Sequence, residues 1–118
     1  MGLNRTVAAI FGVVYLVAGI AGFILTSPLF GLFEVNTLHS IVHVLIGAAL
    51  LYAMMNAATA VMANRWIGIL LLVLGVLGFF VANPANLIPI GGNDVWLHLA
   101  SGVVLLGVSL MGSETATV

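Results

Sequence analysis

The chain has 118 residues, of which 64% are hydrophobic and only 4% are charged. A soluble domain usually carries about 25% charged residues, so this composition excludes a soluble globular domain, a disordered chain and a nucleic-acid-binding protein with a basic face. The absence of cysteine also excludes a disulfide and a thiolate metal site. We therefore predict an all-α integral membrane protein.

Four apolar segments have about the 20 residues that a helix needs to cross a bilayer. In chain order they cover residues 5–26, 36–55, 65–82 and 94–112. Pro28 and Pro84 follow the first and third segments, and proline cannot continue a helix. Asn93 and Asp94, residue types that cap helix N-termini, begin the fourth. The sequence thus predicts one transmembrane domain over 1–118, an integral membrane four-helix bundle.

The two arginines predict the orientation of this bundle. An even number of spans places the start of the chain, the middle loop over 56–64 and the end of the chain on one side. Arg5 and Arg65 both belong to that side. Because short cytoplasmic loops are enriched in Lys and Arg, we predict that both termini are cytoplasmic.

The two halves of the chain resemble each other. Aligning Phe11–Pro28 with Ile67–Pro84 matches three glycines and the final proline, and the segments that follow align His43 with His98. A duplicated pair of helices returns to its starting side, so the two copies are parallel in the membrane. We therefore predict two parallel two-helix hairpin repeats, with His43 and His98 at similar depth.

All three histidines, His39, His43 and His98, lie near the beginnings of the second and fourth spans. Ionisable groups inside a span are costly and usually mark a function or a satisfied internal partner. One hypothesis is purely structural: each imidazole forms a hydrogen bond across helices to a nearby serine or asparagine. Such bonds contribute about 0.6–2 kcal/mol each in membranes.

A second hypothesis is a tetrapyrrole, either haem or chlorophyll. Imidazole is a common axial ligand, and helical bundles hold cofactors between facing helices. The second and fourth helices of a simple bundle are diagonal and about 11–14 Å apart, which places His43 and His98 on either side of one macrocycle. Gly47 and Gly102, each four residues after a histidine, would clear space for a flat ring, and His39 would be a further binding residue.

A third hypothesis is a transition-metal ion. His39 and His43 are separated by four residues, a spacing that lets two side chains of one helix bind one ion. His98 and Glu34 would complete this metal site. The sequence contains no paired carboxylates, no serine–histidine–acid set and no phosphate-binding loop, so we predict that the protein is not an enzyme.

The stretches over residues 38–47 and 93–102 resemble a family of small bacterial four-span membrane proteins, known as domain of unknown function 4383. The resemblance covers essentially the whole chain and rests on a histidine-rich start of helix two and a Trp-Leu-His start of helix four. The residues that carry it are His39, His43, Asn93, Asp94, Trp96, His98 and Gly102. The resemblance implies a membrane bundle in a bacterial inner or photosynthetic membrane, and it implies no activity.

Taken with the short loops, these features predict a small non-enzymatic accessory subunit of a larger membrane complex, whose histidines ligate a tetrapyrrole. Its partners would be the lipid bilayer and other membrane subunits, and no nucleic acid. A metal-ion binding or transport protein, built on the histidines, is the alternative function. Purely structural histidines remain the alternative for the site.

Overall fold

The computed structural model describes residues 2–25, 27, 29, 31, 33 and 35–111. Its helices are, in chain order, α1 (Leu3–Ile24), α2 (Thr37–Ala53), α3 (Ala57–Phe80), the short 3-10 helix η1 (Pro84–Asn86) and α4 (Asn93–Leu110). Within the described residues the only extended pairing is an isolated bridge between Leu29 and Phe33. The prediction of an all-α four-helix protein is confirmed.

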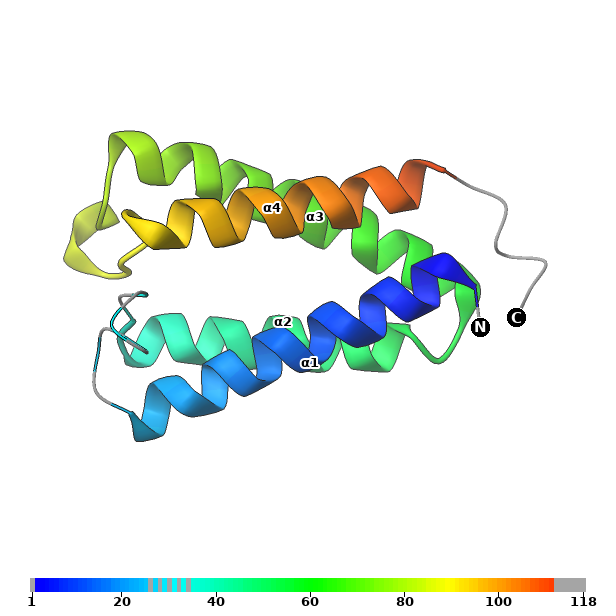
Figure 1. The fold of residues 1–118 in the computed structure, drawn as a ribbon, viewed down its shortest axis with the longest axis horizontal. Coiled ribbons are helices and arrows are strands. Elements are labelled where there is room, and N and C mark those ends of the chain that lie inside the picture. Colours follow the sequence, from blue (N-terminus) through cyan, green and yellow to red (C-terminus); the bar gives the residue numbers. More distant parts are fainter. Residues whose placement is uncertain are drawn as a thin grey trace.

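The helices form two antiparallel hairpins, α1 with α2 and α3 with α4 (Figure 1). The start of α1, the α2–α3 turn and the end of α4 lie together at one end of the bundle. We call it the arginine end, because the Arg5 and Arg65 side chains form bonds there. The opposite end, where α2 and α4 begin, is called the histidine end. The predicted common side for the start of α1, the middle turn and the end of α4 is therefore confirmed, while the side of the membrane stays a prediction.

Helix length and the distribution of side chains both suit a lipid environment. α1, α3 and α4 are long and apolar enough to span a membrane. α2 is also apolar but has 17 residues, about 26 Å at 1.5 Å per residue, slightly less than a hydrocarbon core of about 30 Å. Large apolar side chains face outward, among them Ile10, Leu45, Val73 and Val103. The buried polar side chains include all three histidines, Asn4, Asn64 and Ser40. This arrangement is that of a bundle surrounded by lipid.

The third helix begins at Ala57, so the predicted loop over 56–64 is wrong. The side chain of Asn56 accepts hydrogen bonds from the backbone N–H groups of Ala58, at 2.8 Å, and Thr59, at 3.4 Å. An asparagine in this position satisfies amides that a helix start would otherwise leave unpaired. The chain therefore turns directly from α2 into α3.

The fourth helix begins at Asn93, but the predicted capping by Asn93 and Asp94 is wrong. The residue that precedes the helix is Gly92, with a φ of 62° and no side-chain cap. Glycine adopts this left-handed conformation without steric cost, which lets the chain turn sharply into α4. Asp94 instead lies buried in the first helical turn, where a negative charge interacts favourably with the helix N-terminus.

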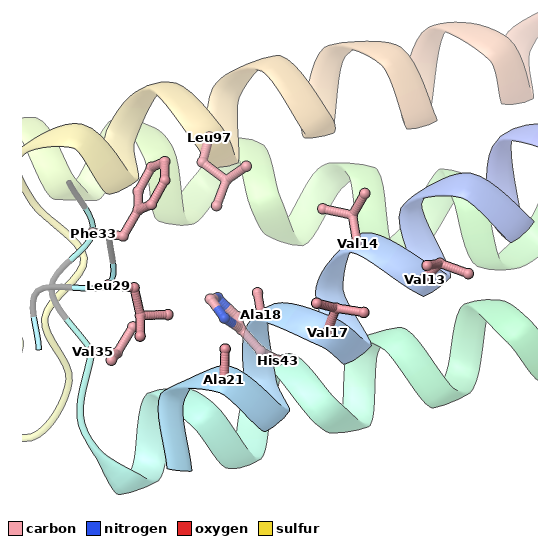
Figure 2. A pocket seen from close by; sticks show the side chains of 10 residues that line it. All are labelled: Val13, Val14, Val17, Ala18, Ala21, Leu29, Phe33, Val35, His43 and Leu97. Atoms are coloured by element: carbon pink, nitrogen blue, oxygen red, sulfur yellow. The ribbon is translucent and has the colours of Figure 1, made fainter. Parts of the chain in front are cut away.

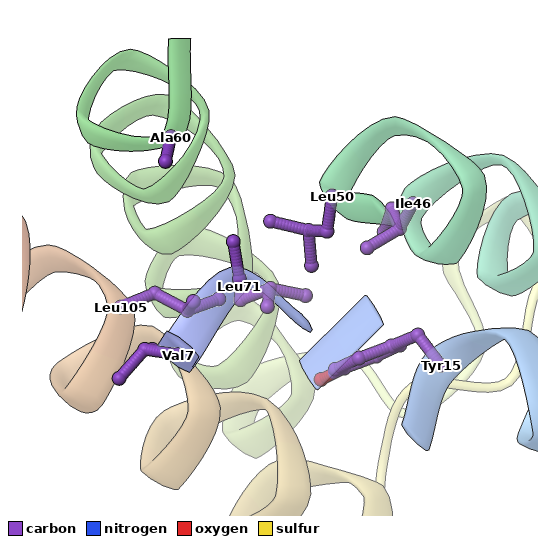
Figure 3. Close-up of a cluster of buried hydrophobic side chains, with 8 residues drawn as sticks. Val7, Tyr15, Ile46, Leu50, Ala60, Leu71 and Leu105 are labelled. Carbon is purple, nitrogen blue, oxygen red and sulfur yellow. The ribbon is translucent and has the colours of Figure 1, made fainter. Parts of the chain in front are cut away.

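A layer of apolar side chains joins the two hairpins between the middle of the bundle and the arginine end. It consists of Val7, Ala8, Tyr15, Ile46, Leu50, Ala60, Leu71 and Leu105. Figure 3 shows side chains from all four helices meeting in this layer. Leu50, Leu71 and Leu105 are fully buried. Because lipid is as apolar as these side chains, their contribution comes from close packing rather than from the removal of water.

Glycines allow the two helices of each hairpin to approach closely. A Cβ atom added to Gly68 would lie only 2.6 Å from the backbone nitrogen of Leu106. The corresponding contacts pair Gly12 with Leu51, Gly47 with Leu16, Gly68 with Leu106 and Gly102 with Leu72. They occur at the positions that the internal alignment matches, so the two hairpins pack through equivalent residues. The duplication of the sequence itself stays a prediction.

At the arginine end, each arginine binds the last turn of a neighbouring helix. Nε of Arg5 donates to the backbone carbonyl of Met54 at 2.7 Å, and Nη2 of Arg65 donates to that of Ser109 at 3.0 Å. The last carbonyls of a helix lack partners within the helix, and a cation there also opposes the negative end of the helix dipole. The arginines thus tie α1 to α2 and α3 to α4.

An asparagine pair connects the two hairpins and leads to a stability prediction. Nδ2 of Asn64 donates to the backbone oxygen and to Oδ1 of Asn4, both at 3.0 Å, and both side chains are fully buried. We expect Asn64→Leu to lower the free energy of unfolding by about 1–2 kcal/mol, the range found for hydrogen bonds between membrane helices. Denaturation in detergent micelles, followed by circular dichroism, measures the free energy of unfolding of the wild type and the variant. The exposed Asn83 provides the control, and an equal effect of Asn83→Leu would contradict a specific role of the pair.

Candidate metal centre

Three buried histidines come from α2 and α4, which lie diagonally across the bundle and pack mainly against their hairpin partners. The side chain of Asn36 accepts a hydrogen bond from the backbone N–H of His39 at 2.8 Å, which fixes the first turn of α2. His43 follows one turn later, so both side chains project from the same face. His98 lies in the second turn of α4. Because α2 and α4 both begin at the histidine end, their first two turns place all three histidines at the same level of the bundle.

The side chains meet in the interior, although their helices do not pack closely. The ring centroids of His39 and His43 are 4.2 Å apart, and those of His98 lie 5.9 Å from His39 and 6.1 Å from His43. One ring nitrogen from each histidine can be chosen so that all three lie within 4.8 Å of one another. Each side chain is at most 3% exposed. We call these three residues the histidine cluster.

A small cavity adjoins the histidine cluster. Its volume is about 10 Å³, close to the minimum that holds a single water molecule. Apart from the three imidazoles its walls are apolar, formed by Val42, Ile46, Leu71, Leu74, Ile88 and Ile90. The cavity is therefore of the size of one small ion or one water molecule.

The hydrogen bonds expected of purely structural histidines are incomplete. Both ring nitrogens of His43 and Nδ1 of His98 are buried without a hydrogen-bond partner among the described residues. Polar atoms buried in this way usually have a partner, and each exception calls for an explanation. The described side chains therefore leave these three nitrogens to be satisfied by a water molecule or by a bound ion.

Two further polar residues lie beside the histidine cluster. The buried ring of Tyr15 stands edge-on to His43, with centroids 5.2 Å apart. Asp94, fully buried, precedes His98 by one turn of α4 and so shares its face. Tyr15 is not among the site residues predicted from the sequence, although a lone tyrosine inside the first apolar segment is a signal for it. The sequence predicts Asp94 as a helix-capping residue and as one of the residues that carry the family resemblance, but not as a residue of the site.

The remaining predicted site residues do not join the histidine cluster. Gly47 and Gly102 lie against α1 and α3, whose backbones take up the space that we expected these glycines to clear for a flat ring. Glu34, the fourth ligand in the metal hypothesis, lies outside the described residues. Trp96 is exposed and packs edge-on against Phe79, with ring centroids 5.6 Å apart.

Fold and site together define a small membrane-like bundle of four helices with a buried cluster of three histidines. The family model described as Domain of unknown function (DUF4383) matches residues 5–111, and the chain belongs to this family. The match includes the whole histidine cluster, and it confirms the resemblance found in the sequence. No curated protein and no solved structure matches the chain.

Proposed function

We propose that this protein binds one transition-metal ion inside the bundle, through His39, His43 and His98. The observation that carries the proposal is the convergence of three buried ring nitrogens within 4.8 Å of one another. Neutral imidazole is the commonest protein ligand for transition metals, and three histidines form a known ligand set for Zn²⁺. Imidazole also suits copper, iron and nickel, so the ligand set leaves the identity of the metal open.

The distances are compatible with this ligand set. Zn–N bonds of about 2.0–2.1 Å in a tetrahedral site place the three nitrogens about 3.3 Å apart. Small rotations of the imidazole rings bring nitrogens within 4.8 Å of one another to that spacing. The cavity of about 10 Å³ beside the rings offers room for an ion. The carboxylate of Asp94, buried one turn from His98, supplies negative charge on the same face of α4.

A single ion is better supported than a tetrapyrrole within the histidine cluster. A macrocycle held between His43 and His98 needs a wide flat slot, and the cavity there is about 10 Å³. His39 lies beside both rings, with centroid distances of 4.2 Å and 5.9 Å, so it occupies part of the space that such a slot requires. A metal ion bound by all three side chains, in contrast, requires the three imidazole rings to lie this close together.

We further propose a binding or transport role rather than catalysis, in a bacterial membrane with the arginine end facing the cytoplasm. Three protein ligands leave a fourth position on a tetrahedral ion, which an incoming ligand can take. We also propose that the outward-facing apolar helices contact other membrane subunits, and co-purification from native membranes tests this association. Recovery of the protein only as a monomer would contradict that association.

Titration of the purified protein with Co²⁺ tests the metal site. Co²⁺ replaces Zn²⁺ in tetrahedral sites and gives visible absorption bands that the colourless Zn²⁺ lacks. We expect saturation at one Co²⁺ per chain and loss of the bands when Zn²⁺ is added. Absence of saturable bands in a folded protein, together with no uptake of Zn²⁺, Cu²⁺ or Ni²⁺ in equilibrium dialysis, would overturn the proposal.

An absorption spectrum of the protein isolated from its native membrane gives an independent test. A colourless sample that contains one metal ion per chain supports the metal site. A Soret band with reduced α-bands would instead establish haem, and red bands that do not change on reduction would establish chlorophyll. Either set of bands, if lost on replacing His43 and His98, would overturn the assignment of the histidine cluster to a single ion.

A further inference from the structure

Part of the wall of the small cavity beside the histidine cluster is a loop rather than a helix. Among the described residues that line this cavity, all belong to α2, α3 or α4 except Ile88 and Ile90. Both lie in the connection between α3 and α4, at the histidine end of the bundle (Figure 1). The loop therefore forms a wall of the cavity toward this end.

Two other sides of the histidine cluster are closed to an ion. Toward the arginine end, Leu50, Leu71 and Leu105 are fully buried, so an ion could pass only by separating the two hairpins. Beside α1, a larger pocket of about 360 Å³ contacts the His43 ring (Figure 2). Both ring nitrogens of His43 are buried, however, so this pocket does not expose the atoms that would bind an ion. The α3–α4 loop is thus a wall that can move while the helices stay in place.

The loop has a fixed base on α3. The backbone N–H groups of Ile90 and Gly91 both donate to the carbonyl oxygen of Ala82, at 2.8 Å and 3.0 Å. A Cβ atom added to Gly78 would collide with the carbonyl oxygen of Ile90, so this base packs directly on α3. Residues 83–89 extend beyond the base, and we call them the flap. Because both ends of the flap meet at the base, the base is the hinge for its movement.

The backbone of the flap is strained. Ala85 and Asn86 have φ angles of 53° and 57°, in the left-handed region that residues with a Cβ atom rarely adopt. Such residues persist only where the surrounding structure holds them, and they occur often in switch regions. The closed position of the flap therefore depends on contacts outside its own backbone.

One such contact joins the flap to the other hairpin. Nδ2 of Asn36 donates to the backbone carbonyl of Leu87 at 2.7 Å. Oδ1 of the same side chain accepts from the backbone N–H of His39. Next to the bonded carbonyl, Ile88 lines the cavity. One amide group therefore connects the flap to the start of α2, the helix that carries two of the three histidines.

We propose that the flap is a gate for the histidine cluster. A metal ion enters and leaves at the histidine end when the hydrogen bond between Asn36 and Leu87 opens and Ile88 moves out of the cavity. The cavity of about 10 Å³ holds one ion or one water molecule, so a hydrated ion cannot pass the closed flap. The role of the gate rests on the proposed metal site, although its movement can be measured without a metal ion.

Diethyl pyrocarbonate measures access to the histidines in metal-free protein. The reagent acylates neutral imidazole, and the product has its own ultraviolet absorption. The chain has three histidines and all of them belong to the histidine cluster, so protein without a histidine tag reports on the cluster alone. Because each side chain is at most 3% exposed, we expect a slow reaction in the wild type.

Asn36→Ser tests the hydrogen bond that holds the flap. Serine removes the Nδ2 donor but keeps a side-chain oxygen for the N–H of His39, since serine also caps helices. We expect diethyl pyrocarbonate to react about tenfold faster, the factor by which the loss of one hydrogen bond shifts an opening equilibrium. The control is Asn56→Ser, the same change in the capping asparagine of α3 at the arginine end, which should react at the wild-type rate.

Ile88→Ala tests the side chain that closes the cavity and leaves Asn36 unchanged. The smaller side chain opens the wall of the cavity, so this variant should also react faster than the wild type. The control is Ile41→Ala, on α2 at the level of the histidines, where the isoleucine is 42% exposed and outside the cavity. Ile41→Ala should leave the rate unchanged.

Exchange of Co²⁺ connects the flap to the metal site. We expect Asn36→Ser to speed both the uptake of Co²⁺ and its release to EDTA about tenfold, with an unchanged dissociation constant. A gate that opens equally in free and bound protein changes both rates by the same factor. A changed dissociation constant with an unchanged release rate would show that Asn36 only caps α2, and it would overturn the gate.

Two results with diethyl pyrocarbonate would also overturn the gate. One is equal reactivity of Asn36→Ser and Asn56→Ser, and the other is equal reactivity of Ile88→Ala and Ile41→Ala. If the reagent gives the expected pattern but no Co²⁺ binds, the metal proposal fails and the flap over the histidines stands. If Co²⁺ binds but both flap variants exchange it at the wild-type rate, the gate fails and the metal site stands.

Discussion

Alanine in place of any one of the three histidines is expected to lower the affinity for Zn²⁺ or Co²⁺ by more than about 100-fold, since the loss of even an outer-shell partner costs 10–100-fold. The reason is geometric: the three ring nitrogens converge within 4.8 Å, and each supplies one ligand of a shared ion. Competition between Co²⁺ and Zn²⁺, followed through the visible bands of Co²⁺, measures the three affinities separately.

His39→Ala is the decisive variant of this series. A tetrapyrrole held by His43 and His98 would tolerate the loss of His39, whereas a three-histidine metal ion would not. Ser101→Ala is the control, because Ser101 is a buried polar residue of α4 that offers no imidazole. Retention of metal affinity in His39→Ala would show that the ligand set is wrong. Zn²⁺ should also raise the melting temperature of the wild type and of Ser101→Ala only, since a ligand stabilises only the folded state that binds it.

Two glycines of α4 are expected to respond differently to the same substitution by alanine. A Cβ on Gly102 would lie 2.9 Å from the backbone nitrogen of Leu72 and 2.9 Å from the carbonyl oxygen of Gly68, whereas one on Gly107 would meet nothing within 4 Å. Gly102→Ala should therefore lower the free energy of unfolding by about 1–3 kcal/mol, because α4 must move away from α3. Gly107→Ala should leave it unchanged or raise it by up to about 1 kcal/mol through helix propensity.

Unfolding in mixed micelles, followed by circular dichroism, compares the two variants under identical conditions. Because both sites lie on one helix and gain the same methyl group, the difference between them isolates the contact with α3. Equal stability of the two variants would mean that the close approach of α4 to α3 does not hold the second hairpin together.

Much of the fold followed from local properties of the sequence. Long apolar segments predict helices that cross a membrane, and Pro28 and Pro84 mark where two of them stop. The number and order of the helices were therefore predicted correctly. The start of α3 was predicted wrongly, because the apolar pattern weakens between Asn56 and Asn64. Only the hydrogen bonds that the Asn56 side chain accepts show that α3 already begins there.

The candidate site was predicted in its residue types but not in its arrangement. The spacing of His39 and His43 places them on one face, since helical periodicity is a local property. The prediction of a slot beside Gly47 and Gly102 depended on how each helix is rotated about its axis. In the structure both glycines face the partner helix of their own hairpin, and the imidazoles face the centre of the bundle.

By itself, the sequence determined the composition of the bundle: four apolar helices, small residues for close packing, and three histidines near the starts of two helices. Only the tertiary structure decided that His98 meets the α2 pair, that Tyr15 stands beside His43, and that the two hairpins enclose a cavity of about 10 Å³. The physical reason is the range of the forces. Hydrogen bonding along a helix is local, whereas the rotation and spacing of helices depend on side chains of all four helices packing at once.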